Sequence, residues 1–140
     1  MAELLYKDLT EKIIKSFLEV YNLLGNGYSK DVYLEALSVE MRNHGLVFER
    51  DVHKDVFYKN NRVGQFKFDF VNDDKVLVRV ETAERVNASV EFSLVNQLKA
   101  ANYEIGLLLN FGRRPEVKRK IFQNGRKVLK KGVIPNEAGN

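Results

Sequence analysis

The spacing of apolar side chains predicts that the chain begins with two helices. Over Asp8–Leu24, apolar residues recur every three or four positions, which is the period of one face of an α-helix. Gly25–Gly27 interrupts this pattern, and it resumes over Ser29–Gly45. We therefore expect two consecutive amphipathic helices, the first of them opened by a capping box of Asp8 and Glu11.

From Leu46 the apolar period changes to two, which is typical of strands with one buried face. A first strand is predicted in two stretches, Val47–Val52 and Val56–Lys59, followed by a tight turn at Asn60 and Asn61. Further strands are predicted over Val63–Val71 and, after a turn at residues 72–74, over Val76–Thr82. These strands should pair as an antiparallel meander.

Alternating positions in two of these strands place charged side chains on one side of the sheet. The strand Val63–Val71 has two sets of alternating residues, namely Phe66, Phe68 and Phe70 on one face and Lys67, Asp69 and Val71 on the other. The phenylalanines are expected in the core. On the next strand Arg79 and Glu81 share a face, so that Asp69, Arg79 and Glu81 can converge.

The remaining pattern predicts a third helix and two more strands. Apolar residues at helical spacing favour a helix from about Asn87 or Ser89 to Ala101. The uniformly apolar run Ile105–Leu109 predicts a buried central strand, and Val117–Phe122 predicts a strand near an edge. The order ααβββαββ indicates a single α/β domain over residues 1–134, with a mixed sheet flanked by helices and a disordered tail at residues 135–140.

Composition limits the location and the metal chemistry of the protein. No apolar run approaches the roughly 20 residues that span a bilayer, and residues 1–10 lack the apolar stretch of a secretory signal, so a soluble, cytoplasmic protein is expected. The chain has no cysteine and 2 histidines, which excludes disulfides and disfavours a histidine-rich zinc site. We predict structural roles for His44, at a helix end, and for His53, in a polar strand. Tyr33 is expected in the core.

The charge is distributed unevenly along the chain. The net charge is +4, but residues 113–131 hold nine lysines or arginines against one acid, which gives +8 there and −4 elsewhere. A basic segment of this kind favours contact with the phosphates of DNA or RNA, although a solvated strand fits the charge equally well. The candidate nucleic-acid-binding residues are Arg113, Arg114, Lys118, Arg119 and Lys120.

Several local segments, taken in order, resemble one protein family. They are Leu24-Gly25-Asn26-Gly27 with Tyr33–Leu37, then Gly64–Val71 with Lys75–Val78, and finally Asn96–Ala100 with Gly106–Gly112. Their order and spacing, over about Leu5 to Phe122, are similar to those of the bacterial GxxExxY proteins of the PD-(D/E)XK nuclease superfamily. The resemblance implies a restriction-endonuclease-like α/β fold.

The resemblance also implies a magnesium-dependent nuclease site with three acids and one base. Hard cations take carboxylate oxygens and lower the pKa of a bound water. The strand aspartate of the family is Asp69 here, but Lys30 replaces the helix glutamate, Arg79 replaces the strand glutamate and Glu81 replaces the strand lysine. The net charge of the set therefore changes from −2 to zero. Two further family positions, a glutamine and a histidine, also differ: they are Ser93 and Val90.

These replacements suggest that internal ion pairs take the place of the metal. In this hypothesis Lys30 pairs with Glu81 or Asp69, and Arg79 pairs with Asp69. We then expect no cofactor and no metal-dependent cleavage, with contact to nucleic acid retained.

Two alternatives stay open. The first is an active magnesium-dependent nuclease with a rearranged site, in which Asp69 and Glu81 are the metal ligands, Lys30 takes the role of the family's strand lysine, and Glu35 or Glu84 supplies a further carboxylate. The second is a protein-interaction or dimerisation module, for which a homodimer is one form.

Overall fold

Helices and strands follow one another in the predicted order ααβββαββ in the computed structural model, which describes residues 6–127. The elements are α1 (Lys7–Leu24), α2 (Lys30–Asn43), β1 (Phe48–Tyr58), β2 (Asn61–Asn72), β3 (Val76–Glu81), α3 (Ala88–Lys99), β4 (Ile105–Phe111), β5 (Pro115–Ile121) and the short 3₁₀ helix η2 (Asn124–Arg126). The α/β class is thus confirmed. The predicted disordered tail at residues 135–140 lies outside the described residues. None of the described helices has the length and apolar character needed to cross a membrane.

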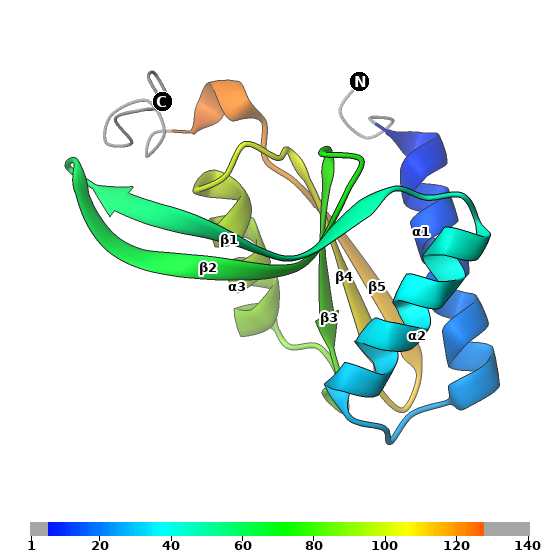
Figure 1. Ribbon diagram of the computed structural model, residues 1–140. Coiled ribbons are helices and arrows are strands. Elements are labelled where there is room, and N and C mark those ends of the chain that lie inside the picture. The colour runs from blue at the N-terminus through cyan, green and yellow to red at the C-terminus, as the bar shows by residue number, and fades with distance from the viewer. Residues whose placement is uncertain (1–5, 128–140) are drawn as a thin grey trace.

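The strands form one mixed sheet in the order β1-β2-β3-β4-β5. Neighbouring strands are antiparallel except β3 and β4, which are parallel and are joined by the crossover helix α3. Every residue of β4 is buried, and β5 lies at the edge of the sheet, as predicted for both strands (Figure 1).

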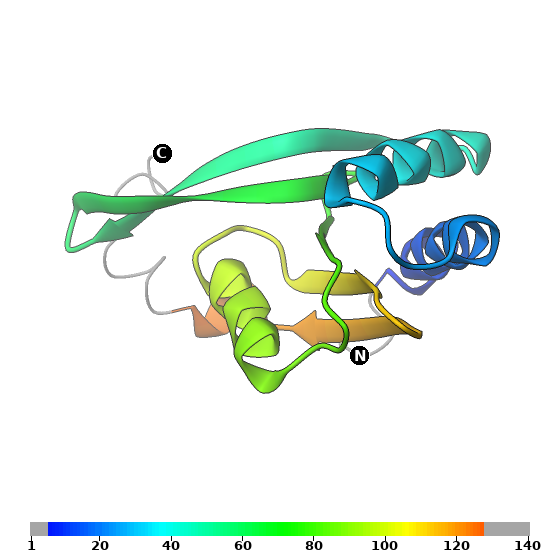
Figure 2. The same ribbon diagram turned by 90° about the horizontal axis from the view of Figure 1, so that it is seen from below.

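Helices cover both faces of the central strands. α1 and α2 lie together on one face and α3 lies on the other (Figures 1 and 2). The larger core cluster joins α1 and α2 to alternate residues of β3 and β4, and Tyr33 lies at its centre, fully buried and stacked on Phe111 with 3.9 Å between ring centroids. The Tyr33 hydroxyl donates to the carbonyl of Gly25 at 2.6 Å. This confirms the predicted core role of Tyr33, which also anchors the α1–α2 loop.

The three phenylalanines of β2 do not share one core face, so that prediction is wrong. Phe70 packs in the cluster under α1 and α2, whereas Phe68 and the half-buried Phe66 pack in the cluster under α3. The reason is a change of direction at Asp69. β2 stops pairing with β3 at Phe70, so its outer half follows β1 alone and curls toward α3 (Figures 1 and 2).

Two local predictions at element ends are also corrected. The capping box of Asp8 and Glu11 does not form, because the N-cap of α1 is Tyr6 and Asp8 already lies in the first turn; Lys7 Nζ pairs instead with Glu11 at 2.7 Å. The hairpin turn lies one residue earlier than expected. Lys59 and Asn60 have φ values of 47° and 67°, as a two-residue type I′ turn requires.

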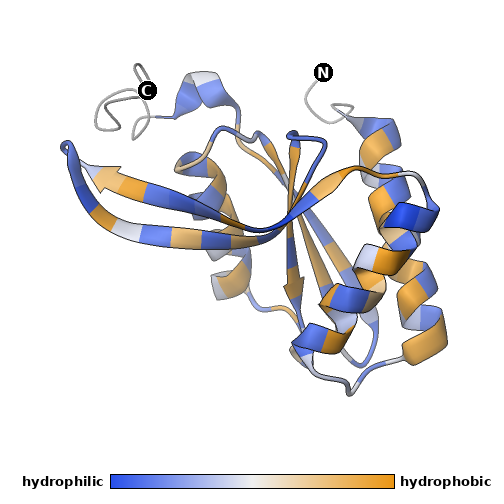
Figure 3. Cartoon of the chain, in the orientation of Figure 1, coloured by the Kyte–Doolittle hydropathy of each residue, from blue (hydrophilic) through white to orange (hydrophobic). Residues whose placement is uncertain are grey.

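The first strand is continuous rather than divided into two stretches. β1 runs from Phe48 to Tyr58, and the residues between the two predicted stretches, His53–Asp55, pair regularly with β2; a register shift follows between Val56 and Phe57. Along the outer hairpin, hydrophilic and hydrophobic residues alternate in Figure 3, because side chains on one face stay in solvent.

A buried amide holds the loop that follows β3 against the end of β4. Asn110 is fully buried, accepts from the amide of Ala83 at 2.9 Å and donates to the carbonyl of Ala83 at 2.9 Å. It also donates to Glu116 at 2.8 Å, and Glu116 accepts from the amide of Val86 at 3.0 Å. The segment 83–86 is therefore fixed beside the β4–β5 turn.

We predict that Gly112→Ala destabilises the domain. A Cβ atom at this position would lie 2.5 Å from the Ala83 carbonyl oxygen and 2.6 Å from that of Glu84, both of them backbone atoms. The free energy of unfolding, measured by urea denaturation, should fall by about 2 kcal/mol or more. Gly64→Ala is the matched control, because no atom lies within 4 Å of the added Cβ. Equal effects of the two substitutions would show that the loop yields easily at Gly112.

Candidate functional site

The candidate site lies where β2 and β3 separate. The last paired residues are Phe70 on β2 and Val78 on β3, and Asp69 is the next residue outward on β2. Its carboxylate Oδ2 accepts the backbone N–H of Val80 at 2.8 Å. A side chain thus satisfies a backbone donor that strand pairing would otherwise satisfy, and Asp69 is held in place with only 4% of its surface exposed.

A cavity of about 190 Å³ occupies the gap between the separating strands. It receives side chains from α2, β2, β3 and α3, and the residues that line it are Lys30, Lys67, Phe68, Asp69, Arg79, Glu81 and Gln97. The convergence of Asp69, Arg79 and Glu81 expected from strand alternation is therefore present, and Lys30 joins them from the first turn of α2.

The charged side chains of this cavity form two ion pairs. Lys30 Nζ lies 3.1 Å from Asp69 Oδ2, which is one of the two partners predicted for it. The predicted contact of Arg79 with Asp69 is absent. Arg79 Nε instead lies 2.7 Å from Glu81 Oε2, because the two residues are two apart on β3 and so project from the same face. Arg79 Nη1 also donates to Ser93 Oγ on α3 at 2.8 Å.

The Lys30–Asp69 pair compensates two charges that would otherwise be poorly placed. Lys30 lies at the N-terminus of α2, where the helix dipole disfavours a cation, and the carboxylate of Asp69 offsets that cost. The Asp69 side chain is 5% exposed and that of Lys30 is 43% exposed, so the lysine brings both charge and solvent contact to a buried acid. We name these two ion pairs, Lys30–Asp69 and Arg79–Glu81, the charge cluster.

The charge cluster does not fit a divalent cation. Both of its carboxylates already carry a cationic partner, and its charges sum to zero. A dication about 4 Å from a single guanidinium meets a repulsion of about 8 kcal/mol at an effective dielectric constant of about 20. Arg79 cannot relieve this repulsion by losing a proton.

The two further glutamates considered as ligands lie elsewhere. Glu35 pairs with Arg50 at 3.2 Å and Glu84 pairs with Arg113 at 3.2 Å, and neither of them lines the cavity. Sequence reasoning missed Gln97, whose buried Oε1 has no hydrogen-bond partner within residues 6–127. Its position one helical turn after Ser93 was the available signal.

The five predicted basic residues do not form a single surface. Lys118 and Lys120 lie 3.9 and 2.7 Å from the carboxylate of Glu91 on α3, and the hydrogen bond from Lys120 lowers the pKa of Glu91. Arg119 occupies the alternate position on β5 and projects toward the opposite face of the sheet. Arg113 and Arg114 are adjacent, in the turn that precedes β5.

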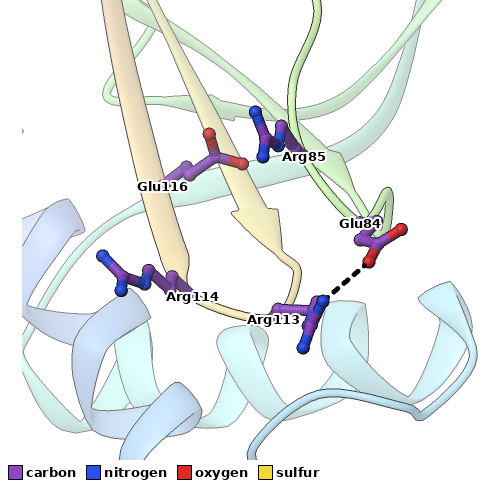
Figure 4. Close-up of a pocket in the computed structure, with 5 residues that line it drawn as sticks. All are labelled: Glu84, Arg85, Arg113, Arg114 and Glu116. Atoms are coloured by element: carbon purple, nitrogen blue, oxygen red, sulfur yellow. Dashed lines mark hydrogen bonds and ion pairs between the residues drawn. The ribbon is translucent and has the colours of Figure 1, made fainter.

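A larger cavity of about 630 Å³ lies beside that turn, and its lining residues are Glu84, Arg85, Arg113, Arg114 and Glu116 (Figure 4). Arg113 pairs with Glu84 at 3.2 Å, and both side chains are largely exposed. Within residues 6–127, Arg85 and Arg114 have no carboxylate within ion-pair distance. A neighbouring cavity of about 400 Å³ shares Glu84 and Arg113 with it and extends to Asn26–Tyr28. We name the surface that lines these two contiguous cavities the arginine rim.

One known protein family matches most of the chain. A family model described as PD-(D/E)XK nuclease superfamily matches residues 7–120. No curated protein and no solved structure matches the chain.

We predict that Asp69 stabilises the fold. Asp69→Ala leaves the amide of Val80 without its acceptor and Lys30 without its partner, so the free energy of unfolding should fall by about 2–3 kcal/mol. Asp69→Asn retains an acceptor for Val80 and should cost about 1 kcal/mol. Urea denaturation measures both changes.

Asp55→Ala is the matched control for this prediction, because Asp55 forms an exposed ion pair with Arg62 and should contribute about 0.5 kcal/mol or less. Crowded, unpaired carboxylates of the kind that bind metal would give the opposite result, since removing one of them relieves repulsion. An increase in stability on Asp69→Ala would therefore contradict the ion-pair arrangement.

Proposed function

Since the chain belongs to the PD-(D/E)XK nuclease superfamily, we propose that it binds nucleic acid through phosphate contacts and does not cleave it by the metal-dependent reaction typical of that superfamily. The observation that carries this proposal is the charge cluster. Lys30 Nζ is 3.1 Å from the one carboxylate kept from the superfamily's site, and Arg79 Nε is 2.7 Å from the other carboxylate of the cavity.

Loss of the metal would remove the central step of the superfamily's reaction. A bound magnesium ion supplies a water of lowered pKa and offsets charge on the scissile phosphate. The residues present here offer two carboxylates that are both already paired, so they support neither of these roles. Lys30 is likewise engaged by Asp69, which argues against its service as a free general base.

Within the superfamily, we place the chain with the GxxExxY type. The support comes from the α1–α2 loop and its tyrosine. Gly25 and Gly27 have φ values of 70° and 110°, which favour glycine, and the Tyr33 hydroxyl donates to the carbonyl of Gly25 at 2.6 Å. These contacts give the glycines and the tyrosine of the motif a structural role that does not need its glutamate, the position that Lys30 occupies here.

The arginine rim is the surface that we assign to phosphate binding. Within the described residues, Arg85 and Arg114 form no ion pair. The ion pair of Arg113 with Glu84 is exposed, and such pairs contribute little to the free energy of unfolding, so Arg113 can exchange this partner for a phosphate. Guanidinium groups bind phosphate oxygens in a bidentate manner. By contrast, Lys118 and Lys120 are held by Glu91, which makes them weaker candidates.

We predict that reversing the charges restores metal binding. The triple variant Lys30→Glu, Arg79→Glu, Glu81→Lys returns the net charge of the site to −2, and it should bind magnesium or manganese in a calorimetric titration where the natural chain does not. Adding Asp69→Asn to the triple variant should abolish that binding. Circular dichroism checks that each variant is folded. Metal binding and DNA cleavage by the natural chain, both abolished in Asp69→Asn, would instead establish an active nuclease.

We also predict salt-dependent binding to nucleic acid through the arginine rim. Fluorescence anisotropy with single- and double-stranded DNA should give an affinity that falls as salt rises. Arg85→Ala and Arg114→Ala should each weaken binding regardless of base sequence. Each should also reduce the slope of log affinity against log salt concentration by about one for every phosphate that the variant no longer neutralises.

The double variant Lys118→Ala, Lys120→Ala is the matched control, because it removes two cations that are already paired with Glu91. It should change the slope less than either arginine substitution. If the natural chain shows no salt-dependent binding and instead self-associates as its concentration rises, the proposal fails and a dimerisation module is favoured.

A further inference from the structure

A second group of chemically active side chains lies between α1 and α2, and none of its members lines any of the three cavities described above. It consists of Glu19 on α1, Glu40 on α2 and His44, the C-cap residue of α2. His44 Nε2 lies 3.3 Å from Glu40 Oε2 and 3.6 Å from Glu19 Oε1, and all three candidate ligand atoms lie within 4.8 Å of one another.

The fold itself brings these three side chains together. Glu40 and His44 are four residues apart and therefore lie on the same side of α2, where its last turn ends. α1 packs against α2 in the same helical layer (Figure 1), and Glu19 of α1 lies within 3.6 Å of His44. The three residues are thus positioned by two helices whose apolar faces share one core, rather than by a flexible loop.

The His44 nitrogen points to a shared position between the two acids. Nε2 is buried and makes no hydrogen bond within residues 6–127, although two carboxylate oxygens are close to it. If Nε2 donated a hydrogen bond to one carboxylate, its N–H would point at that oxygen. The geometry of Nε2 meets this requirement for neither Glu19 nor Glu40. That geometry is expected when three ligand atoms face a common point.

The charges at this position favour a cation. Two carboxylates with a neutral imidazole carry −2. Among residues 6–127, no lysine or arginine nitrogen lies within ion-pair distance of Glu19 or Glu40. The contrast with the charge cluster is direct, because there each acid has its own basic partner.

We propose that Glu19, Glu40 and His44 bind a zinc ion and that this ion ties α1 to the end of α2. Zinc takes histidine nitrogen and carboxylate oxygen at about 2.0–2.2 Å, and in a tetrahedral shell two such ligands lie about 3.3 Å apart. The two distances to His44 are already close to that value. Glu19, whose side chain is 49% exposed, can close the remaining separation, and water completes the shell. Magnesium, which prefers six oxygen ligands, fits this set poorly.

The proposal is tested by titrating zinc into the full chain in competition with a chromophoric chelator. One equivalent should bind, and His44→Gln and Glu40→Gln should each weaken binding tenfold or more. His53→Gln is the matched control, since it removes the other of the 2 histidines, and it should bind zinc as the natural chain does. Asp69→Asn should also leave zinc affinity unchanged, which separates this site from the charge cluster.

A second measurement does not depend on the variants. The imidazole NMR signals of His44 should shift or broaden on adding zinc while those of His53 do not, and the melting temperature should rise with zinc concentration. Absence of binding at about 100 μM zinc, a concentration at which a site of micromolar affinity would be nearly full, would overturn the proposal. So would equal loss of affinity in the His44 and His53 variants.

Discussion

The contact between the Asp69 carboxylate and the backbone N–H of Val80 governs the arrangement of the rest of the site. β2 and β3 pair only as far as Phe70 and Val78, so beyond that point the backbone donor needs a different acceptor. Because a side chain supplies it, the strands can separate without leaving a buried donor unsatisfied. The separation makes the cavity, lets the β1–β2 hairpin curl toward α3, and leaves Asp69 facing the start of α2.

The same separation explains how the site accommodates three changed charges, at Lys30, Arg79 and Glu81, and one changed polar residue, Ser93. Lys30 enters the gap from α2 and reaches Asp69, while Arg79 stays on its own strand and spans from Glu81 to Ser93. Lys30 thus pairs with Asp69, which is retained from the superfamily's set, and Arg79 pairs with Glu81, which is itself a replacement. Mutual compensation of this kind stabilises the domain, because isolated buried charges would destabilise it.

Much of the fold followed from hydrophobic periodicity, since each helix and strand buries a face whose spacing is visible in the sequence. The convergence of Asp69, Arg79 and Glu81 followed from strand alternation in the same way. Sequence reasoning failed where the answer depended on how two strands lie relative to each other. It could not place Phe68 and Phe70 in different clusters, because the bend at Asp69 arises where β2 ceases to pair with β3. Nor could it foresee that Glu91 on α3 engages Lys118 and Lys120.

The electrostatics of the charge cluster and of the arginine rim bear on the same question, namely how a phosphate could approach this end of the sheet. A site of charge −2 repels a phosphate until a metal neutralises it, so in such a site binding and metal uptake are coupled. With the cluster at zero net charge, that barrier is absent, and Arg85, Arg113 and Arg114 give the neighbouring cavity an excess of one positive charge over Glu84 and Glu116. The proposed contact with nucleic acid would therefore need no cation to offset the charge of the site. The same replacements that pair both carboxylates of the cavity with cations also bring the net charge of the cluster to zero.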